Sequence, residues 1–486
     1  MSAAESRIAG KLAAAVAASL IMAWLLRDLK PDAQATGAVF TGTVILWLTQ
    51  ALPLAVSALL GVAALVVSGG SNEKAAFAAF GDPILLLFMG SFILAKGITE
   101  SGLERRISHR ILCEGWATRT PARMLLSIGA VSCGISLLVS NTAVTAMMLP
   151  IGIGLLAAIG ERDPSSKFAM GMMLMLTWGS SVAVGVLVGT PPNLLAQAQI
   201  AEVSGKSIGF IDWMVFAMPI NAVMLLAAWF VLRRMYAREN RPFADATAAS
   251  RQALAEMGPI SQAERNTLWV FAVTFFLWLL PDGSGIVLGT KHPLAVWFNQ
   301  HLTPSVSALI GAGLLFILPC RENPSGRTLS WKQASQIEWG IVLLIGGGMA
   351  LGKAMFDSGL AEEAGRALAT TLGVTDVWQI TLLATFLAIA MSELASNTAS
   401  ATTVVPIAIG LAQAQGVSPV APALGAAIGA SFGFMLPVST APNALVYSSG
   451  LIPQKEMVKS GAIIDLIGLV TTVGLLRLIL PMMGLD

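Results

Sequence analysis

The feature that most constrains the fold is a series of apolar runs that recurs along nearly the whole chain. A transmembrane helix needs about 20 mostly apolar residues, and many of these runs reach that length. Only 12% of the 486 residues are charged, against about 25% in a soluble protein. The chain is therefore predicted to be an all-α polytopic membrane protein, with the lipid bilayer as its surroundings. A net charge of +2 gives no reason to expect a nucleic-acid partner.

The apolar runs predict about eleven transmembrane helices. Lys and Arg are enriched in cytoplasmic loops, so the basic stretches that contain Arg105, Arg233 and Arg327 are assigned to the inside. This places the N-terminus in the cytoplasm and the C-terminus outside. We expect an integral plasma membrane protein, in a bacterium one of the inner membrane. The expected spans are 8–26, 37–51, 54–69, 83–99, 168–200, 213–232, 267–281, 303–319, 339–356, 420–450 and 462–482.

Several motifs occur twice, in the same order and at a nearly constant spacing. The segment GSFILAKGITESGL resembles GGMALGKAMFDSGL, and Ser-Asn-Thr occurs in two apolar stretches. A proline follows each of these threonines eight residues later, and VGTPPNLLA resembles VSTAPNALV. This pattern indicates an internal duplication. The paired segments begin at residues 90 and 347, 140 and 396, and 188 and 438.

The duplication divides the chain into four predicted parts. The first repeat holds five spans, an odd number, so the second repeat is predicted to be inverted in the membrane. Inverted repeats are typical of secondary transporters. The parts are a first span at 1–36, inverted repeat 1 at 37–232, a cytoplasmic linker at 233–264 and inverted repeat 2 at 265–486.

Each repeat contains an apolar stretch with Ser-Asn-Thr near its middle. The 37 residues between Arg123 and Glu161 would form a single helix of about 55 Å, whereas the hydrocarbon core is about 30 Å thick. The charged flanks favour a re-entrant hairpin at about 124–160 that enters from inside and carries the triplet at its tip. Its counterpart, at about 378–412, would enter from outside. Two full spans per stretch are the alternative.

A second segment of each repeat is predicted to be a span broken by proline, at about 168–200 and about 420–450. Proline disrupts helix interiors, and irregular backbone at membrane depth is tolerated only where it is buried or lines a cavity. We expect both hairpin tips and both broken spans to converge on a solute site near the midplane. Ser, Thr and Asn are also common helix N-caps, and a capping role is compatible with binding.

The two predicted hairpins and the two broken spans offer hydroxyls, amides and free backbone groups but no Lys, Arg or His. Oxygen ligands suit an alkali cation, and helix N-termini suit an anion. Glu393 could add negative potential at a cation site or anchor the hairpin through hydrogen bonds. No nucleophile–base or metal constellation indicates an enzyme. An anion channel is a remote alternative, because hairpin tips that close over a midplane site predict saturable, stoichiometric flux.

The sequence resembles the divalent anion/sodium symporter family, which includes sodium-coupled dicarboxylate and citrate transporters and some sulfate carriers. The likeness rests on Ser-Glu-x-x-Ser-Asn-Thr at 392–398, GTPPN at 189–193 and FMLPVSTAPNALV at 434–446. It implies a homodimer, with a scaffold domain and a transport domain in each protomer. The transport domain would contain the hairpins and broken spans and move by an elevator mechanism.

The resemblance also implies the site residues. At least two Na⁺ ions are expected, the first held by Ser136, Ser140, Asn141 and Gly189, and the second by Ser392, Ala395, Asn397 and Ser439. The anion would contact Asn141, Thr142, Thr190, Asn397, Thr398 and Thr440. Two positions depart from the family pattern. Ser392 stands where Thr is frequent, and Ala441 stands at the first proline of the common sequence Thr-Pro-Pro-Asn.

The predicted function is Na⁺-coupled symport of a C4-dicarboxylate such as succinate, malate or fumarate. The alternative on the same fold is a dicarboxylate exchanger, or a citrate or sulfate carrier. The sequence leaves the choice of anion, the number of ions and the effect of Ala441 open.

Overall fold

The fold is described from a computed structural model that covers residues 3–161, 163, 165–205, 208–237 and 246–485. Every regular element in these ranges is a helix, which agrees with the predicted all-α class. The helices of the first half are α1 (Ala3–Leu25), α2 (Pro31–Thr49), α3 (Leu54–Val67), α4 (Glu73–Ala78), η1 (Ala79–Gly81), α5 (Pro83–Ser101), α6 (Leu103–Leu112), α7 (Gly115–Thr118), α8 (Pro121–Ser136), α9 (Asn141–Ala158), α10 (Lys167–Ser181), η2 (Leu187–Gly189), α11 (Pro191–Ser204) and α12 (Phe210–Tyr236).

The second half repeats much of this order. A long helix and a short amphipathic helix precede two helices joined at a Ser-Asn-Thr triplet, then two short helices and a final long one. The helices are α13 (Ala246–Glu256), α14 (Gln262–Leu288), α15 (Pro293–His301), α16 (Pro304–Ile317), α17 (Trp331–Ala334), α18 (Trp339–Asp357), α19 (Leu360–Leu372), α20 (Val377–Leu394), α21 (Asn397–Ala414), α22 (Val420–Ala430), α23 (Ala441–Ser448) and α24 (Gln454–Met483).

By length and composition, eight helices among the described residues could cross a membrane, or up to nine if the bent pair α15–α16 forms one span. Six of the eight, namely α1, the helix at 73–101, α12, α14, α18 and α24, lie at predicted spans. The other two, α9 and α20, lie in the predicted hairpins. The other predicted spans coincide with helices that are short, broken or less apolar, because prolines and polar residues interrupt them. Helices that could cross a membrane therefore occur along the whole described chain, and the count of eleven spans stays a prediction.

The repeated Ser-Gly-Leu sequence forms the same turn in both halves. Gly102 ends α5 with φ +75°, and Gly359 lies between α18 and α19 with φ +76°. A side chain at this backbone angle would be strained, so glycine is favoured at both turns. The leucine that follows is buried and begins a short amphipathic helix, α6 or α19. The turn thus redirects the chain from a long apolar helix into a short one with a polar face.

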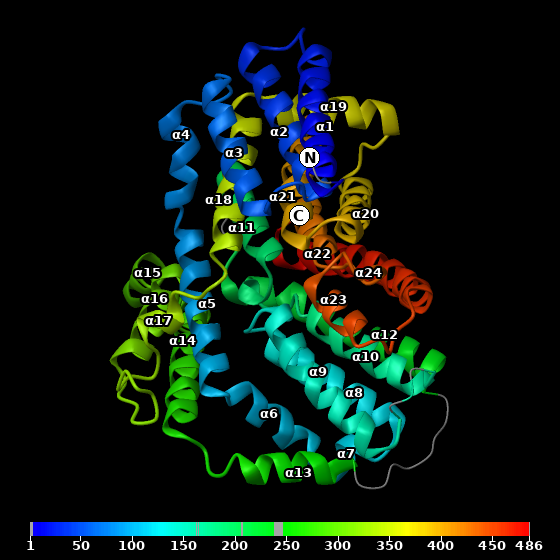
Figure 1. Ribbon diagram of the computed structural model, residues 1–486. Helices are drawn as coiled ribbons and strands as arrows, with labels where there is room; N and C mark the ends of the chain where they lie inside the picture. Colours follow the sequence, from blue (N-terminus) through cyan, green and yellow to red (C-terminus); the bar gives the residue numbers. More distant parts are fainter. Residues whose placement is uncertain (1–2, 162, 164, 206–207, 238–245, 486) are drawn as a thin grey trace.

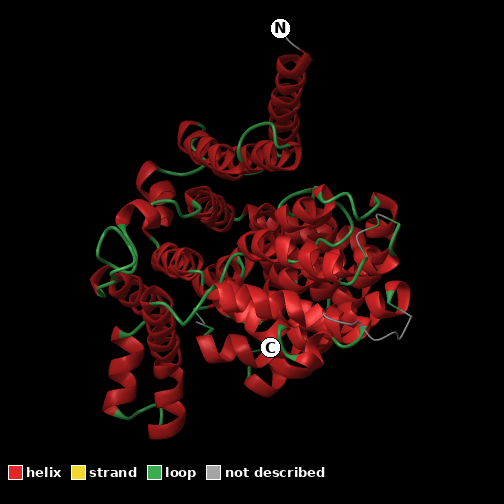
Figure 2. Cartoon of the chain, turned by 60° about the horizontal axis from the view of Figure 1, so that its bottom comes forward, coloured by secondary structure: helices red, strands yellow, loops and turns green. Residues whose placement is uncertain are grey.

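The helices form one body from which α1 projects. Figure 2 shows α1 standing away from the other helices, and α1 packs mainly on α2. Its most apolar window is only 6% buried, as expected for a helix that faces lipid. In Figure 1, α8, α9 and α10 lie side by side, and α11, α18, α21 and α22 cluster above them.

The predicted linker at 233–264 contains a helix. Helix α13 lies beside α6 and α7 at the edge of the molecule (Figure 1). Residues 238–245 lie outside the described residues. They include Arg238 and Arg241, which belong to the basic stretch around Arg233 that is assigned to the inside. The Arg106 guanidinium ties the end of this segment to α6. It donates to Glu264 at 2.7 Å and to the carbonyl of Gly258 at 2.8 Å.

Candidate functional site

The first Ser-Asn-Thr triplet lies at the junction of two helices. Helix α8 ends at Ser136, and α9 begins at Asn141 with Ser140 as its N-cap. The Ser140 hydroxyl accepts from the backbone N–H of Ala143 at 3.3 Å, and the Ser136 hydroxyl donates to the Asn141 side-chain oxygen at 2.6 Å. The triplet therefore caps a helix and also brings two side-chain oxygens together.

The second triplet repeats this geometry between α20 and α21. Ser396 is the N-cap of α21 and accepts from the N–H of Ala399 at 3.3 Å. The hydroxyl of Ser392 donates toward the Asn397 side-chain oxygen at 2.9 Å and the carbonyl of Ala430 at 2.8 Å. The Asn397 amide donates to the carbonyl of Ser431 at 3.3 Å. The second tip is thereby bound to the irregular segment that follows α22.

Both proline-containing segments are helices interrupted by irregular backbone. In the first, α10 ends at Ser181 and α11 begins at Pro191, with Thr190 as its N-cap. In the second, α22 ends at Ala430 and α23 begins at Ala441, with Thr440 as its N-cap. Proline is tolerated in the first turn of a helix. Pro191 is the first residue of α11 and Pro442 the second residue of α23, so both helices can restart at these prolines.

Two asparagines hold these irregular segments in shape. The Asn193 amide donates to the carbonyls of Val184 and Val186 at 3.2 and 3.1 Å. The Asn443 amide lies within 2.8 Å of the carbonyl of Gly433 and 3.0 Å of that of Leu436. Both asparagines are fully buried. We did not assign them from the sequence, although their matched places in TPPN and TAPN were a usable signal.

Side-chain hydrogen bonds join the two halves across the site. The hydroxyls of Thr190 and Ser431 lie 3.2 Å apart, and the hydroxyl of Thr177 donates to the Asn443 side-chain oxygen at 2.8 Å. All four residues are buried. The two irregular segments are therefore in direct contact, as their convergence on one site requires.

A cavity of about 360 Å³ lies where the two tips and the two irregular segments meet. It is lined by all six residues predicted to contact the anion, Asn141, Thr142, Thr190, Asn397, Thr398 and Thr440. Ser140, Gly189 and Ser439, which were predicted to bind sodium, also line it. The other predicted sodium ligands, Ser136, Ser392 and Ala395, lie buried behind the tips. Ala441, the departure from the family pattern, is exposed to the cavity.

The walls of this cavity are mostly neutral. They include aromatic rings of Phe88 and Phe92 on α5 and aliphatic side chains from α18. Among the described lining residues, Glu338 alone carries a charge. The volume of the cavity lies at the lower end of the range of about 300–1,000 Å³ for small-molecule sites.

Glu393 lies outside the cavity and binds backbone. Its two carboxylate oxygens accept from the N–H groups of Met435 and Leu436 at 2.8 and 3.1 Å, and the residue is 2% exposed. Of the two roles open from the sequence, these contacts match the anchor, because they fasten α20 to the second irregular segment.

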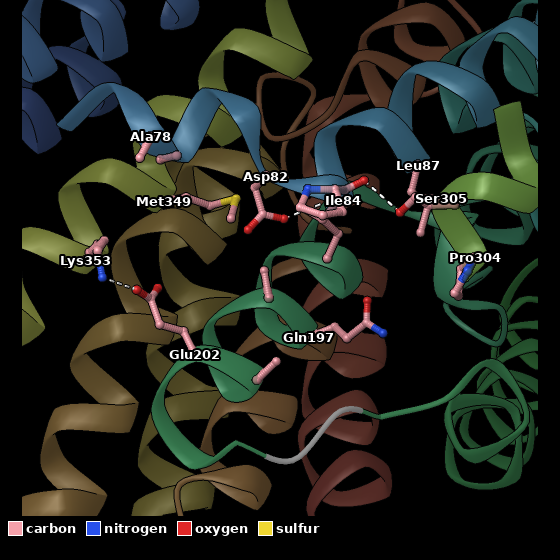
Figure 3. A pocket seen from close by; sticks show the side chains of 14 residues that line it. Ala78, Asp82, Ile84, Leu87, Gln197, Glu202, Pro304, Ser305, Met349 and Lys353 are labelled. Atoms are coloured by element: carbon pink, nitrogen blue, oxygen red, sulfur yellow. Dashed lines mark hydrogen bonds and ion pairs between the residues drawn. The ribbon is translucent and has the colours of Figure 1, made fainter. Parts of the chain in front are cut away.

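A larger cavity of about 580 Å³ lies elsewhere, bounded by α5, α11, α16 and α18 (Figure 3). The Lys353 ammonium in its wall pairs with Glu202 at 2.5 Å and with Asp357 at 3.7 Å. None of the predicted binding residues lines it. The one basic side chain among its described lining residues is paired with acids. This cavity is therefore less favourable for an anion than the smaller one.

Comparison with known proteins places these features in a family. Residues 6–484 match the family model described as the sodium:sulfate symporter transmembrane region. The chain is 31% identical to a sodium-dependent dicarboxylate transporter, SdcS, of Staphylococcus saprophyticus, over 98% of this chain and 93% of that protein. It is 28% identical to SdcS of Staphylococcus aureus strain MRSA252, over 90% of this chain and 85% of the relative.

The fold also resembles a solved transporter structure. The crystal structure of the Alcanivorax borkumensis YdaH transporter, reported to have an unusual topology, aligns with a TM-score of 0.52. The alignment covers 85% of this chain and 88% of that one, at 14% sequence identity. At this identity the likeness concerns the fold alone.

Proposed function

Because the chain belongs to the sodium:sulfate symporter family, and is thus a membrane transporter rather than an enzyme, we propose that it couples Na⁺ entry to the uptake of a C4-dicarboxylate. Succinate, malate and fumarate are the candidate substrates. The names of the relatives, sodium-dependent dicarboxylate transporters, support both the ion and the substrate class. The observation that carries the proposal is the shared cavity, which is lined by both Ser-Asn-Thr triplets and by both proline-containing segments.

The oxygens around each tip fit an alkali cation. Ser136 with Asn141, and Ser392 with Asn397, bring hydroxyl and amide oxygens within 3 Å of each other. A hydroxyl has one proton and two lone pairs, so Ser392 can keep its bond to Ala430 while a lone pair faces an ion. We propose one Na⁺ at each tip. Ser140 and Gly189 would complete the first site beside Ser136 and Asn141, and Ala395 and Ser439 would complete the second beside Ser392 and Asn397.

Helix N-termini suit the anion. Helices α9 and α21 begin at the tips, and α11 and α23 begin at the irregular segments, so four helix starts lie at one cavity. Each start presents unpaired N–H groups and a partial positive charge. Since the described walls contain no Lys or Arg, the affinity for a dianion should depend strongly on bound Na⁺. This dependence is the proposed basis of coupling.

We further propose that the motion is of the elevator type in a homodimer, with the N-terminus in the cytoplasm and the C-terminus outside. The transport unit would comprise the hairpins α8–α9 and α20–α21 and the broken spans α10–α11 and α22–α23. The repeated order of helices in the two halves supports a structural repeat, and we propose that the second copy is inverted in the membrane.

Uptake into proteoliposomes tests the function. An inward Na⁺ gradient should drive accumulation of radiolabelled succinate, and replacement of Na⁺ by choline should reduce uptake to background. The family description names sulfate, so sulfate and citrate should be tested as competitors. Uptake that ignores Na⁺ but requires internal dicarboxylate would identify an exchanger instead. Large anion currents that do not saturate would identify a channel.

A further inference from the structure

One acidic side chain reaches the anion cavity from outside the duplicated motifs. Glu338 is the residue before α18 and lines the cavity together with residues of both tips. The residue is exposed and is one of those that line the cavity. None of the sequence motifs includes it.

The contacts of this carboxylate differ from those of an ordinary helix cap. Glu338 occupies the N-cap position of α18, but its side chain makes no capping hydrogen bond. No ion pair joins it to a basic side chain in the described part of the chain. Its side chain lies near the hydroxyl of Ser140, the residue before Asn141 and Thr142, and both residues line the same cavity.

We propose that Glu338 determines specificity by setting the charge of the anion that the cavity accepts, favouring dianions over trianions. The inference rests on the proposed anion site. A fixed negative charge beside Ser140 repels any anion held by the neighbouring Asn141 and Thr142. Coulomb repulsion is proportional to the charge of the ligand, so a tricarboxylate is penalised more than a dicarboxylate of the same chemistry.

The expected size of the effect follows from Coulomb's law. In a water-filled cavity, a unit charge about 8 Å away weakens the binding of a dianion about sixfold and that of a trianion about fourteenfold. Removal of the charge should therefore improve the binding of citrate about twofold more than that of succinate. A lower local dielectric constant would widen this difference.

The first repeat offers a matched control. Asp82 precedes α5 as Glu338 precedes α18, 256 positions apart, but Asp82 lines the larger cavity of Figure 3. Its carboxylate accepts from the N–H of Ile84 at 2.8 Å and so caps its helix. Asp82→Asn removes an equivalent charge without changing the anion cavity.

The test measures binding by the purified full-length protein in saturating NaCl at pH 8, where citrate is a trianion. Dissociation constants for succinate and citrate are obtained by thermal stabilisation for wild type, Glu338→Gln, Glu338→Asp and Asp82→Asn. We expect Glu338→Gln to lower the ratio of the citrate constant to the succinate constant at least twofold. Glu338→Asp and Asp82→Asn should keep the wild-type ratio. Glu338→Ala provides a second neutral variant should the glutamine protein be unstable.

An unchanged ratio in both neutral variants, with succinate still bound, would overturn the role of Glu338 and leave the proposed function intact. Loss of the selectivity in Asp82→Asn as well would also overturn it, because the effect would then be one of net charge. Failure of wild type to bind either anion in Na⁺ would instead refute the proposed function.

Discussion

The hydroxyl of Ser392 lies 2.9 Å from the side-chain oxygen of Asn397, across the two-residue gap between α20 and α21. The pair Ser136 and Asn141 forms the same contact at 2.6 Å at the other tip. In both cases a serine hydroxyl in the last turn of one helix contacts the side-chain oxygen of the asparagine that begins the next helix. These contacts connect the predicted sodium ligands to the predicted anion ligands.

Ser392→Ala should weaken Na⁺ activation without abolishing transport. The substitution removes one oxygen ligand, and about 1.4 kcal/mol of lost binding free energy corresponds to a tenfold weaker affinity. We expect the Na⁺ concentration for half-maximal succinate uptake to rise about tenfold. Ser392→Thr keeps the hydroxyl and should retain activity, and wild-type Na⁺ dependence in the alanine variant would exclude Ser392 as a ligand.

Asn141→Ala and Asn397→Ala should each reduce uptake to background with little loss of expression. Each asparagine is assigned to both a cation and the anion, so its removal disrupts both. Uptake normalised to protein recovered by size-exclusion chromatography provides the measurement. The control is Asn72→Ala, because Asn72 caps α4 at an exposed position and is remote in sequence from both tips. Wild-type uptake in either tip variant would eliminate the shared site.

Asn443→Ala should destabilise the protein, because its side chain holds the second irregular segment. Its amide lies at three oxygens, and its own oxygen accepts from Thr177. Buried groups left unpaired cost about 1–3 kcal/mol each, so the melting temperature in detergent should fall by several degrees. Thr177→Val removes only one of these bonds and should cause a smaller decrease. Equal melting temperatures for wild type and Asn443→Ala would contradict this role.

We expect Glu104 to make the stability of the protein depend on pH. This residue lies at the start of α6, outside the spanning segments. Burial raises the pKa of its carboxyl from the usual 4.5 to about 7, while the hydroxyl of Thr99 lowers it. The folded state therefore binds more protons than the unfolded state between about pH 4.5 and 7, and stability falls as the pH rises through this range. The melting temperature of wild type should decrease between pH 5.5 and 8 more than that of Glu104→Gln. Parallel curves for the two proteins would refute the assignment.

The sequence by itself determined the helical membrane fold, the interrupted segments and the duplicated motifs. These follow from local properties: apolar length sets the helices, while Pro191 and Pro442 restart helices where proline is tolerated. The predicted anion residues line one cavity because each lies next to such a break. Ser140 and Ser396 also cap helices, as their residue type favours.

Only the tertiary structure decided which distant groups meet. The contact of Thr190 with Ser431 joins segments 241 residues apart, and the contact of Glu393 with Met435 joins segments separated by the two helices α21 and α22. The same holds for Glu338, which reaches the cavity from a helix start that carries no motif. Sequence patterns report local helix geometry, whereas such contacts depend on how the helices pack, and packing is set by the shapes of many side chains together.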